Sequence, residues 1–130
     1  MGLRERSKIK ELQETTIPAR VEAVREICGR AIPIEVDWTT FADDLEALTF
    51  LDNLAGHRLC MALRMVCTDD MTKQAVRDGL TVVKVKNVPG KDQMRLALEG
   101  GVLEMQGAFA LKLDGAFHEG DIRDLLMKKL

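Results

Sequence analysis

The chain has 130 residues, of which 46% are hydrophobic and 31% charged, a composition typical of one globular domain with its own core. Its 21 acidic and 19 basic residues are mixed along the chain, which argues against a general nucleic-acid binder because such proteins usually carry a basic stripe. The longest apolar runs are far shorter than the roughly 20 residues that a membrane helix needs, so we expect no membrane partner.

The N-terminal residues are charged and no apolar segment follows them, so the sequence predicts no secretory signal and a cytoplasmic location. The three cysteines, Cys28, Cys60 and Cys67, are an odd number, and two of them fall among apolar residues on predicted helix faces. Reduced, buried thiols are therefore the expected state.

Residues 3–15 are highly charged and predict a polar helix or a partly frayed arm. The segment from Thr15 to Pro18 is typical of a helix start, since proline is tolerated in a first turn and threonine can cap it. The helix that follows ends at Gly29. Its apolar stripe has helical spacing and consists of Ile17, Val21, Val24 and Cys28.

Residues 32–38 alternate between apolar and polar side chains and predict a strand with one buried face. Pro33 has no backbone N–H to donate, which favours an edge position for this strand. A long apolar face then runs from Phe41 to Cys67 and predicts a helical region, with a kink or a split near Asn53 and Gly56.

The Gly100–Gly101 pair separates two alternating runs, which is a strong signal for a two-residue hairpin turn. With the glycines as the turn, Leu98 pairs with Leu103. Leu96 then pairs with Met105, so both strands present one apolar face. A slip of one residue would destroy this match, so the turn and the pattern agree independently.

The predicted fold class is α+β. Three strands between residues 80 and 110 are joined by short loops, which predicts that they are antiparallel neighbours in a meander. We therefore expect a single antiparallel sheet of about four strands, one early strand plus the C-terminal three-strand meander, packed by helices on one face. Residues 1–130 are expected to form one domain, with residues 1–15 as a candidate polar helical arm.

His57 and Cys60 share one face of the long helix and are the first candidates for chemistry, as a base and a nucleophile or as two metal ligands. Cys28 and Cys67 could in principle complete a four-ligand zinc site with them. The sequence holds no CxxC and no HExxH motif, however, and no third catalytic group can be identified. Packed thiols beside a half-exposed imidazole are the favoured interpretation, and we expect no metal.

Asp69 and Asp70 are a second candidate, because paired carboxylates can hold Mg²⁺ or share a proton. Asp43 and Asp44 form a similar pair. Both pairs lie at predicted helix starts, where capping and the helix dipole account for acids without a metal. His118 precedes the last helix and could lie at a pocket rim, but a helix-entry turn is the plainer interpretation.

A small anion-binding patch is a third candidate. Lys73 and Arg77 lie one turn apart on a predicted helix, and a tertiary structure could place Arg58 and Arg64 beside them. A solvated helix face is the alternative.

The leading hypothesis is a non-catalytic binding or oligomerising module without a cofactor. It rests on the absence of a catalytic motif, the ordinary charge and the apolar excess of the long helix. The side of that helix with Leu54, Met61 and Met65, together with an edge strand, offers surface for a homodimer or for another protein.

Two alternatives remain open. One is a small-molecule-binding or enzymatic domain with a pocket near His57, Cys60 and His118. The other is an inhibitor-type protein that covers another protein's active site with an acidic surface, formed by Asp43, Asp44 and Asp52.

Overall fold

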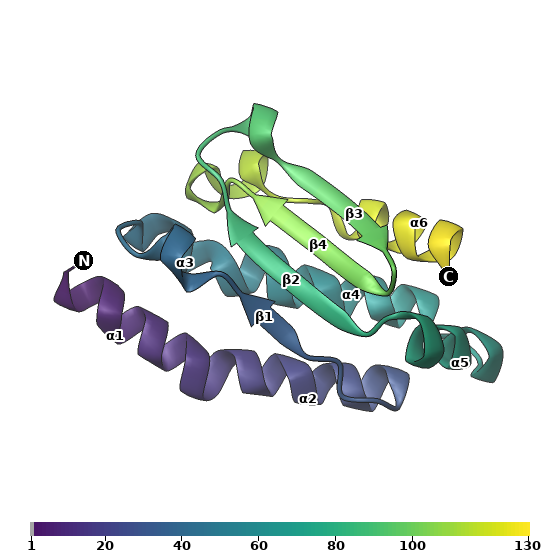
Figure 1. The fold of residues 1–130 in the computed structure, drawn as a ribbon. Helices are drawn as coiled ribbons and strands as arrows, with labels where there is room; N and C mark the ends of the chain where they lie inside the picture. The colour runs from purple at the N-terminus through teal and green to yellow at the C-terminus, as the bar shows by residue number, and fades with distance from the viewer. Residues whose placement is uncertain (1) are drawn as a thin grey trace.

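The computed structural model describes residues 2–130, which form one four-stranded sheet with helices packed against it (Figure 1). The mixed helix-and-strand architecture agrees with the predicted class. The helices are α1 (Leu3–Glu11), α2 (Ile17–Cys28), α3 (Leu45–Leu51), α4 (His57–Val66), α5 (Asp70–Gly79) and α6 (Glu119–Lys129). The strands are β1 (Ile34–Val36), β2 (Val82–Asn87), β3 (Arg95–Glu99) and β4 (Val102–Gly107). None of the helices formed by residues 2–130 has the length and apolar character that crossing a bilayer requires.

The sheet is mixed, so the prediction of an antiparallel sheet with a C-terminal meander is wrong. The strand order is β1-β2-β4-β3, in which β1 and β2 are parallel, β2 and β4 are parallel, and β3 and β4 are antiparallel. The reasoning from short loops failed because residues 88–94 carry the chain past the position that β4 fills. β3 therefore forms the edge, and the hairpin returns β4 into the space between β2 and β3.

The predicted hairpin register is confirmed. Leu98 pairs with Leu103 and Leu96 pairs with Met105. On the same strands, Arg95 pairs with Gln106 and faces away from the helices, as the alternation predicts. The local pattern and the turn therefore predicted the pairing of these two strands correctly.

The predicted edge strand lies at the edge of the sheet but is shorter than expected. β1 covers Ile34–Val36 and pairs only with β2. Pro33 precedes it and accepts a hydrogen bond at its carbonyl from the Val83 N–H (2.9 Å), but it has no N–H to donate to β2 in return, so the strand begins only at Ile34. Trp38 belongs to a 3₁₀ turn that ends at the buried Phe41.

The N-terminal helix continues from α1 to α2 through a π turn at Leu12–Thr16. α2 begins at Ile17 with Pro18 in its first turn, as predicted, but Thr16 does not cap it and no break precedes it. The Ile17 N–H donates to the Leu12 carbonyl, five residues back. This wider turn lets the helix continue past a proline that has no donor.

A second π turn at Asp52–Gly56 joins α3 to α4, where the sequence predicted a kink or a split. The long helix begins at Leu45 rather than at Phe41 and ends at Val66. In Figure 1 its α4 part lies behind the sheet, and the α1–α2 helix runs beside β1.

One core cluster fills the space between the sheet and the helices. Val83, Val85, Leu103 and Met105 are buried on the inner face of the sheet, while Lys84 on the outer face is exposed. Leu12 is also buried in this cluster, so part of the candidate arm packs onto the rest of the chain.

Asn87, at the end of β2, joins three segments by hydrogen bonds. Its backbone N–H donates to Thr40 Oγ1 (3.0 Å), and its Nδ2 donates to the Thr40 carbonyl (3.1 Å) and to Asp44 Oδ2 (3.2 Å). Its Oδ1 accepts the Phe109 N–H (3.3 Å). Asp44 in turn caps α3 by accepting the Ala47 N–H (3.0 Å). This part-buried amide therefore fixes both the segment before α3 and the segment after β4 at this end of the sheet.

The two turn glycines should differ in their tolerance of alanine. Both have a positive φ, +58° at Gly100 and +81° at Gly101, where an alanine costs about 1–2 kcal/mol. A Cβ at Gly101 would also lie 3.0 Å from the Gly79 carbonyl oxygen, whereas at Gly100 nothing lies within 4 Å. We expect Gly101→Ala to lower the free energy of unfolding in urea more than Gly100→Ala; equal losses would contradict this account of the turn.

Asn87→Asp should destabilise the protein by about 2–3 kcal/mol, because it removes both Nδ2 hydrogen bonds and places a second carboxylate beside Asp44. Lys86→Ala, on the exposed face of the same strand, is the matched control and should be nearly neutral. Urea unfolding measures both variants. An Asn87→Asp variant as stable as the parent would show that the amide is not an anchor.

Candidate functional site

His57 and Cys60 both lie on α4, but they differ in exposure. His57 is half-exposed and Cys60 is fully buried. Burial raises the pKa of the Cys60 thiol, although the nearby Arg20 and Arg64 act in the opposite direction. A thiol with a raised pKa is a poor nucleophile. Within residues 2–130 no hydrogen bond joins Cys60 to His57, so this geometry does not activate it.

Cys60 lies instead beside an ion pair that joins the two long helices. Arg20 Nε donates to Asp52 Oδ1 (2.7 Å), and Arg20 Nη2 donates to Asp52 Oδ2 (2.8 Å). Both side chains are part-buried, and a bidentate pair of this kind is stronger and more specific in geometry than a single hydrogen bond. A Cβ on Gly56 would lie 2.9 Å from Asp52 Oδ1, so the glycine leaves room for the pair. Asp52, a member of the acidic surface in one alternative, is thus occupied within the fold.

His118 occupies the helix-entry position that the plainer interpretation predicted. Its Nδ1 accepts the Gly120 N–H (3.0 Å) and caps α6, and its Nε2 lies 3.6 Å from Glu119 Oε1. The side chain is exposed. None of the five most prominent surface hollows on residues 2–130 is lined by His57, Cys60 or His118.

Asp69 is the N-cap of α5. Its Oδ1 accepts the Thr72 N–H (2.8 Å), and Thr72 Oγ1 accepts the Asp69 N–H (3.3 Å), which completes a capping box. The hydrogen bonds from Thr72 lower the pKa of the Asp69 carboxyl. Asp70 follows in the first turn of the helix. Over residues 2–130, no group of three or more His, Cys, Asp and Glu side chains is placed to hold a metal ion.

Removing the Asp69 cap should lower the melting temperature in a pH-dependent way. Because its pKa is lowered on folding, the carboxylate stabilises the protein above the ordinary aspartate pKa, and this contribution is lost as the pH falls through the lowered value. The deficit of Asp69→Ala should therefore be largest at neutral pH and shrink in acid. Asp69→Asn retains an uncharged acceptor and serves as the control. A deficit that did not change with pH would contradict the role of the charge.

Two of the four basic residues of the candidate anion patch contact backbone carbonyls in different places. Arg58 Nη1 donates to the Phe117 carbonyl (2.9 Å), just before α6. Arg77 Nη1 donates to the Cys28 carbonyl (3.1 Å), at the end of α2. Arg64 is exposed on α4, and Lys73 is half-buried on α5. Two of the four guanidinium and ammonium groups therefore bind backbone carbonyls at different places.

The candidate interface residues of the long helix differ in exposure. Leu54 is 1% exposed and belongs to the core, so it offers no surface. Met61 is half-buried, and Met65 is 44% exposed. Of this set, only Met65 presents a wide apolar surface.

A larger apolar cluster lies between α5 and α6. Met71 is 76% exposed, Met127 is 60% exposed and Leu130 is 38% exposed. They border a hollow of about 280 Å³, here named the methionine groove, which is lined by Val66, Met71, Thr72, Ala75, Val76, Leu126, Met127 and Leu130.

A second hollow continues the methionine groove toward the β3–β4 turn. Its volume is about 590 Å³, and it shares Ala75 and Leu130 with the groove. Asp78 of α5 and Lys129 of α6 both line it. The surface therefore has an apolar centre and opposite charges at one end, one on each helix.

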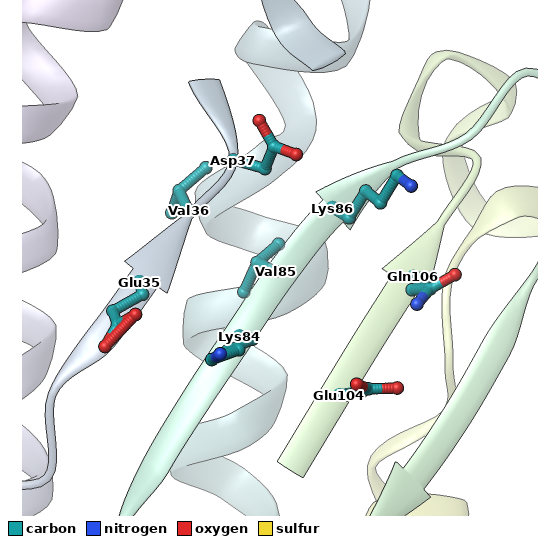
Figure 2. A pocket seen from close by; sticks show the side chains of 8 residues that line it. All are labelled: Glu35, Val36, Asp37, Lys84, Val85, Lys86, Glu104 and Gln106. Atoms are coloured by element: carbon teal, nitrogen blue, oxygen red, sulfur yellow. The ribbon is translucent and has the colours of Figure 1, made fainter. Parts of the chain in front are cut away.

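The outer face of the sheet carries a polar hollow of about 300 Å³ (Figure 2). Glu35, Lys84 and Glu104 lie in register across β1, β2 and β4, so opposite charges alternate along this row. Arg95 Nη1 of β3 lies 3.3 Å from Glu104 Oε2. Cross-strand pairs of this kind stabilise a solvated sheet face. This hollow lies on the side of the sheet away from the helices, not between the two layers.

The chain was compared with protein-family models, with curated proteins and with solved structures, and it matches none of them. What the protein does must therefore be inferred from its own geometry.

Proposed function

We propose that the protein is a non-catalytic, self-associating binding module and that the methionine groove is its contact surface. The observation that carries this proposal is the gathering of Met71, Met127 and Leu130, three widely exposed apolar side chains, around one hollow. Apolar patches of this kind are typical of interaction sites because leaving them in water is unfavourable.

The side chains in the groove suit a protein partner. Methionine is unbranched and polarisable, so it adapts to an irregular apolar surface and is common where proteins bind one another. The groove runs between two helices, and its lining is almost wholly apolar apart from Thr72. A small ligand would find few polar groups here to fix its orientation.

The charges around the groove favour a second copy of the chain as the occupant. Asp78 belongs to α5 and Lys129 to α6, and both line the hollow that continues the groove. A two-fold axis along the groove would place α5 of each copy over α6 of the other. Asp78 of one copy would then face Lys129 of the second copy, and Met71 would face Met127.

The outer face of the sheet and the β1 edge are less suited to this role. The outer face of the sheet is charged and its charges are paired across strands. The edge strand β1 is three residues long, and a short edge is a common protection against strand addition.

Met71→Glu should weaken self-association about tenfold or more, because it places a carboxylate in the apolar centre of the contact. Leu113→Glu is the matched control, since Leu113 is 69% exposed but lies outside the groove and should leave association unchanged. Sedimentation equilibrium over a concentration series measures both variants. Met65→Glu tests the other candidate surface, and a loss with Met65→Glu but not with Met71→Glu would move the contact to α4.

Exchanging the two charges distinguishes an Asp78–Lys129 pair across the two-fold axis from a general effect of charge on self-association. Asp78→Lys and Lys129→Asp should each weaken association, and the double variant should restore most of the loss. A parent chain that stays monomeric at every concentration would contradict the proposal.

A further inference from the structure

We infer that Cys28 and Cys67 form an oxidation site, in which a hydroperoxide converts the two thiols into a reversible disulfide. The two sulfur atoms lie 3.4 Å apart, although Cys28 ends α2 and Cys67 follows α4. They are free thiols in this structure. The inference is independent of the methionine groove and of self-association.

The backbone around both cysteines leaves room for the sulfur atoms to approach. Cys67 is the central residue of an inverse γ-turn, with φ −83° and ψ 64°, in which the Thr68 N–H donates to the Val66 carbonyl (2.9 Å). Cys28 is the last residue of its helix and is followed by Gly29 at φ +87°. Cys28 therefore lies at the last position of one helix and Cys67 just after the end of another, so the backbone shift that a disulfide needs falls at helix ends rather than in a helix interior.

The two thiols are unequal, which assigns their roles. Cys67 is 8% exposed, whereas Cys28 is fully buried, so an oxidant reaches Cys67 first. The hydrogen bond between the two thiols lowers the pKa of Cys67, and Lys73 and Arg77 act in the same direction, while burial opposes them. The same hydrogen bond and burial raise the pKa of Cys28. Cys67 is therefore the attacking thiolate and Cys28 the resolving thiol.

With hydrogen peroxide as the oxidant, the reaction has two steps. The Cys67 thiolate attacks one peroxide oxygen, so that an S–O bond forms, the O–O bond breaks and hydroxide leaves and takes up a proton. The product is a Cys67 sulfenic acid. The Cys28 sulfur then attacks Cys67 Sγ, so that the S–S bond forms and the S–O bond breaks. The hydroxyl group leaves as water with the Cys28 proton, and the peroxide has been reduced to two waters.

Cys60 provides an internal control. It is fully buried, burial raises its pKa, and it lies beside the Arg20–Asp52 ion pair rather than at the end of a helix. It should stay reduced while the other two cysteines are oxidised.

The test uses the reduced full chain, treated with one equivalent of hydrogen peroxide, unfolded in an alkylating agent and analysed by mass spectrometry. We expect the loss of two hydrogen atoms, alkylation at Cys60 alone, and a peptide linking Cys28 to Cys67 within one chain. The native chain should form this link about tenfold faster than the chain in urea. A link that involves Cys60, a link between chains, or equal rates in the folded and unfolded states would overturn the inference.

Variants test the order of the two steps. Cys28→Ala should leave a Cys67 sulfenic acid that dimedone traps, whereas Cys67→Ala should leave Cys28 unoxidised. Cys60→Ala should form the disulfide as the parent does. Dimedone labelling of Cys28 in Cys67→Ala would overturn the assigned order. If either variant fails to fold, early dimedone trapping on the parent chain decides between Cys67 and Cys28.

Discussion

Leu103 and Met105 on β4 hold the sheet against the helices, and the other features depend on this contact. Both side chains are completely buried, and burial of such a side chain contributes about 2 kcal/mol. β4 is also one of the two central strands, and it pairs with β2 in parallel and with β3 in antiparallel orientation. Its position sets where β2 ends, and so where Asn87 meets the 3₁₀ turn before α3 and the segment after β4.

The features that the sequence predicted correctly are local ones. The hairpin register followed from Gly100–Gly101 and the alternation beside it, and the edge position of the first strand followed from Pro33. The strand order could not be predicted in this way, because no local pattern indicates whether β4 or β3 is the strand that pairs with β2. The Arg20–Asp52 pair and the contacts of Asn87 join residues more than 20 positions apart, so spacing along the chain gave no sign of them.

The candidate sites divide in the same way. Capping, the plainer interpretation of Asp69 and His118, needed only helix starts and is what the structure has. The methionine groove was not foreseen, because it combines α5 with α6. Met71 stands in a short, largely polar helix, and Met127 lies outside the buried positions of its own helix, which are Ile122 and Leu126. The proximity of Cys28 to Cys67 likewise needed the packing of α2 against α4.

The two π turns bear on how the length of this chain can change. A turn that closes five residues back holds one residue more than a turn that closes four back, so losing that residue would restore regular winding and leave the following residues facing as before. Losing a residue from a regularly wound part would instead rotate the following segment about the helix axis by about 100°. Arg20 follows one π turn and Asp52 begins the other, so such a rotation in the regular helix before either residue would turn one partner of the ion pair away. Insertions and deletions during divergence should therefore be tolerated in the connections between elements and at the π turns, and purged from the regular parts of these two helices.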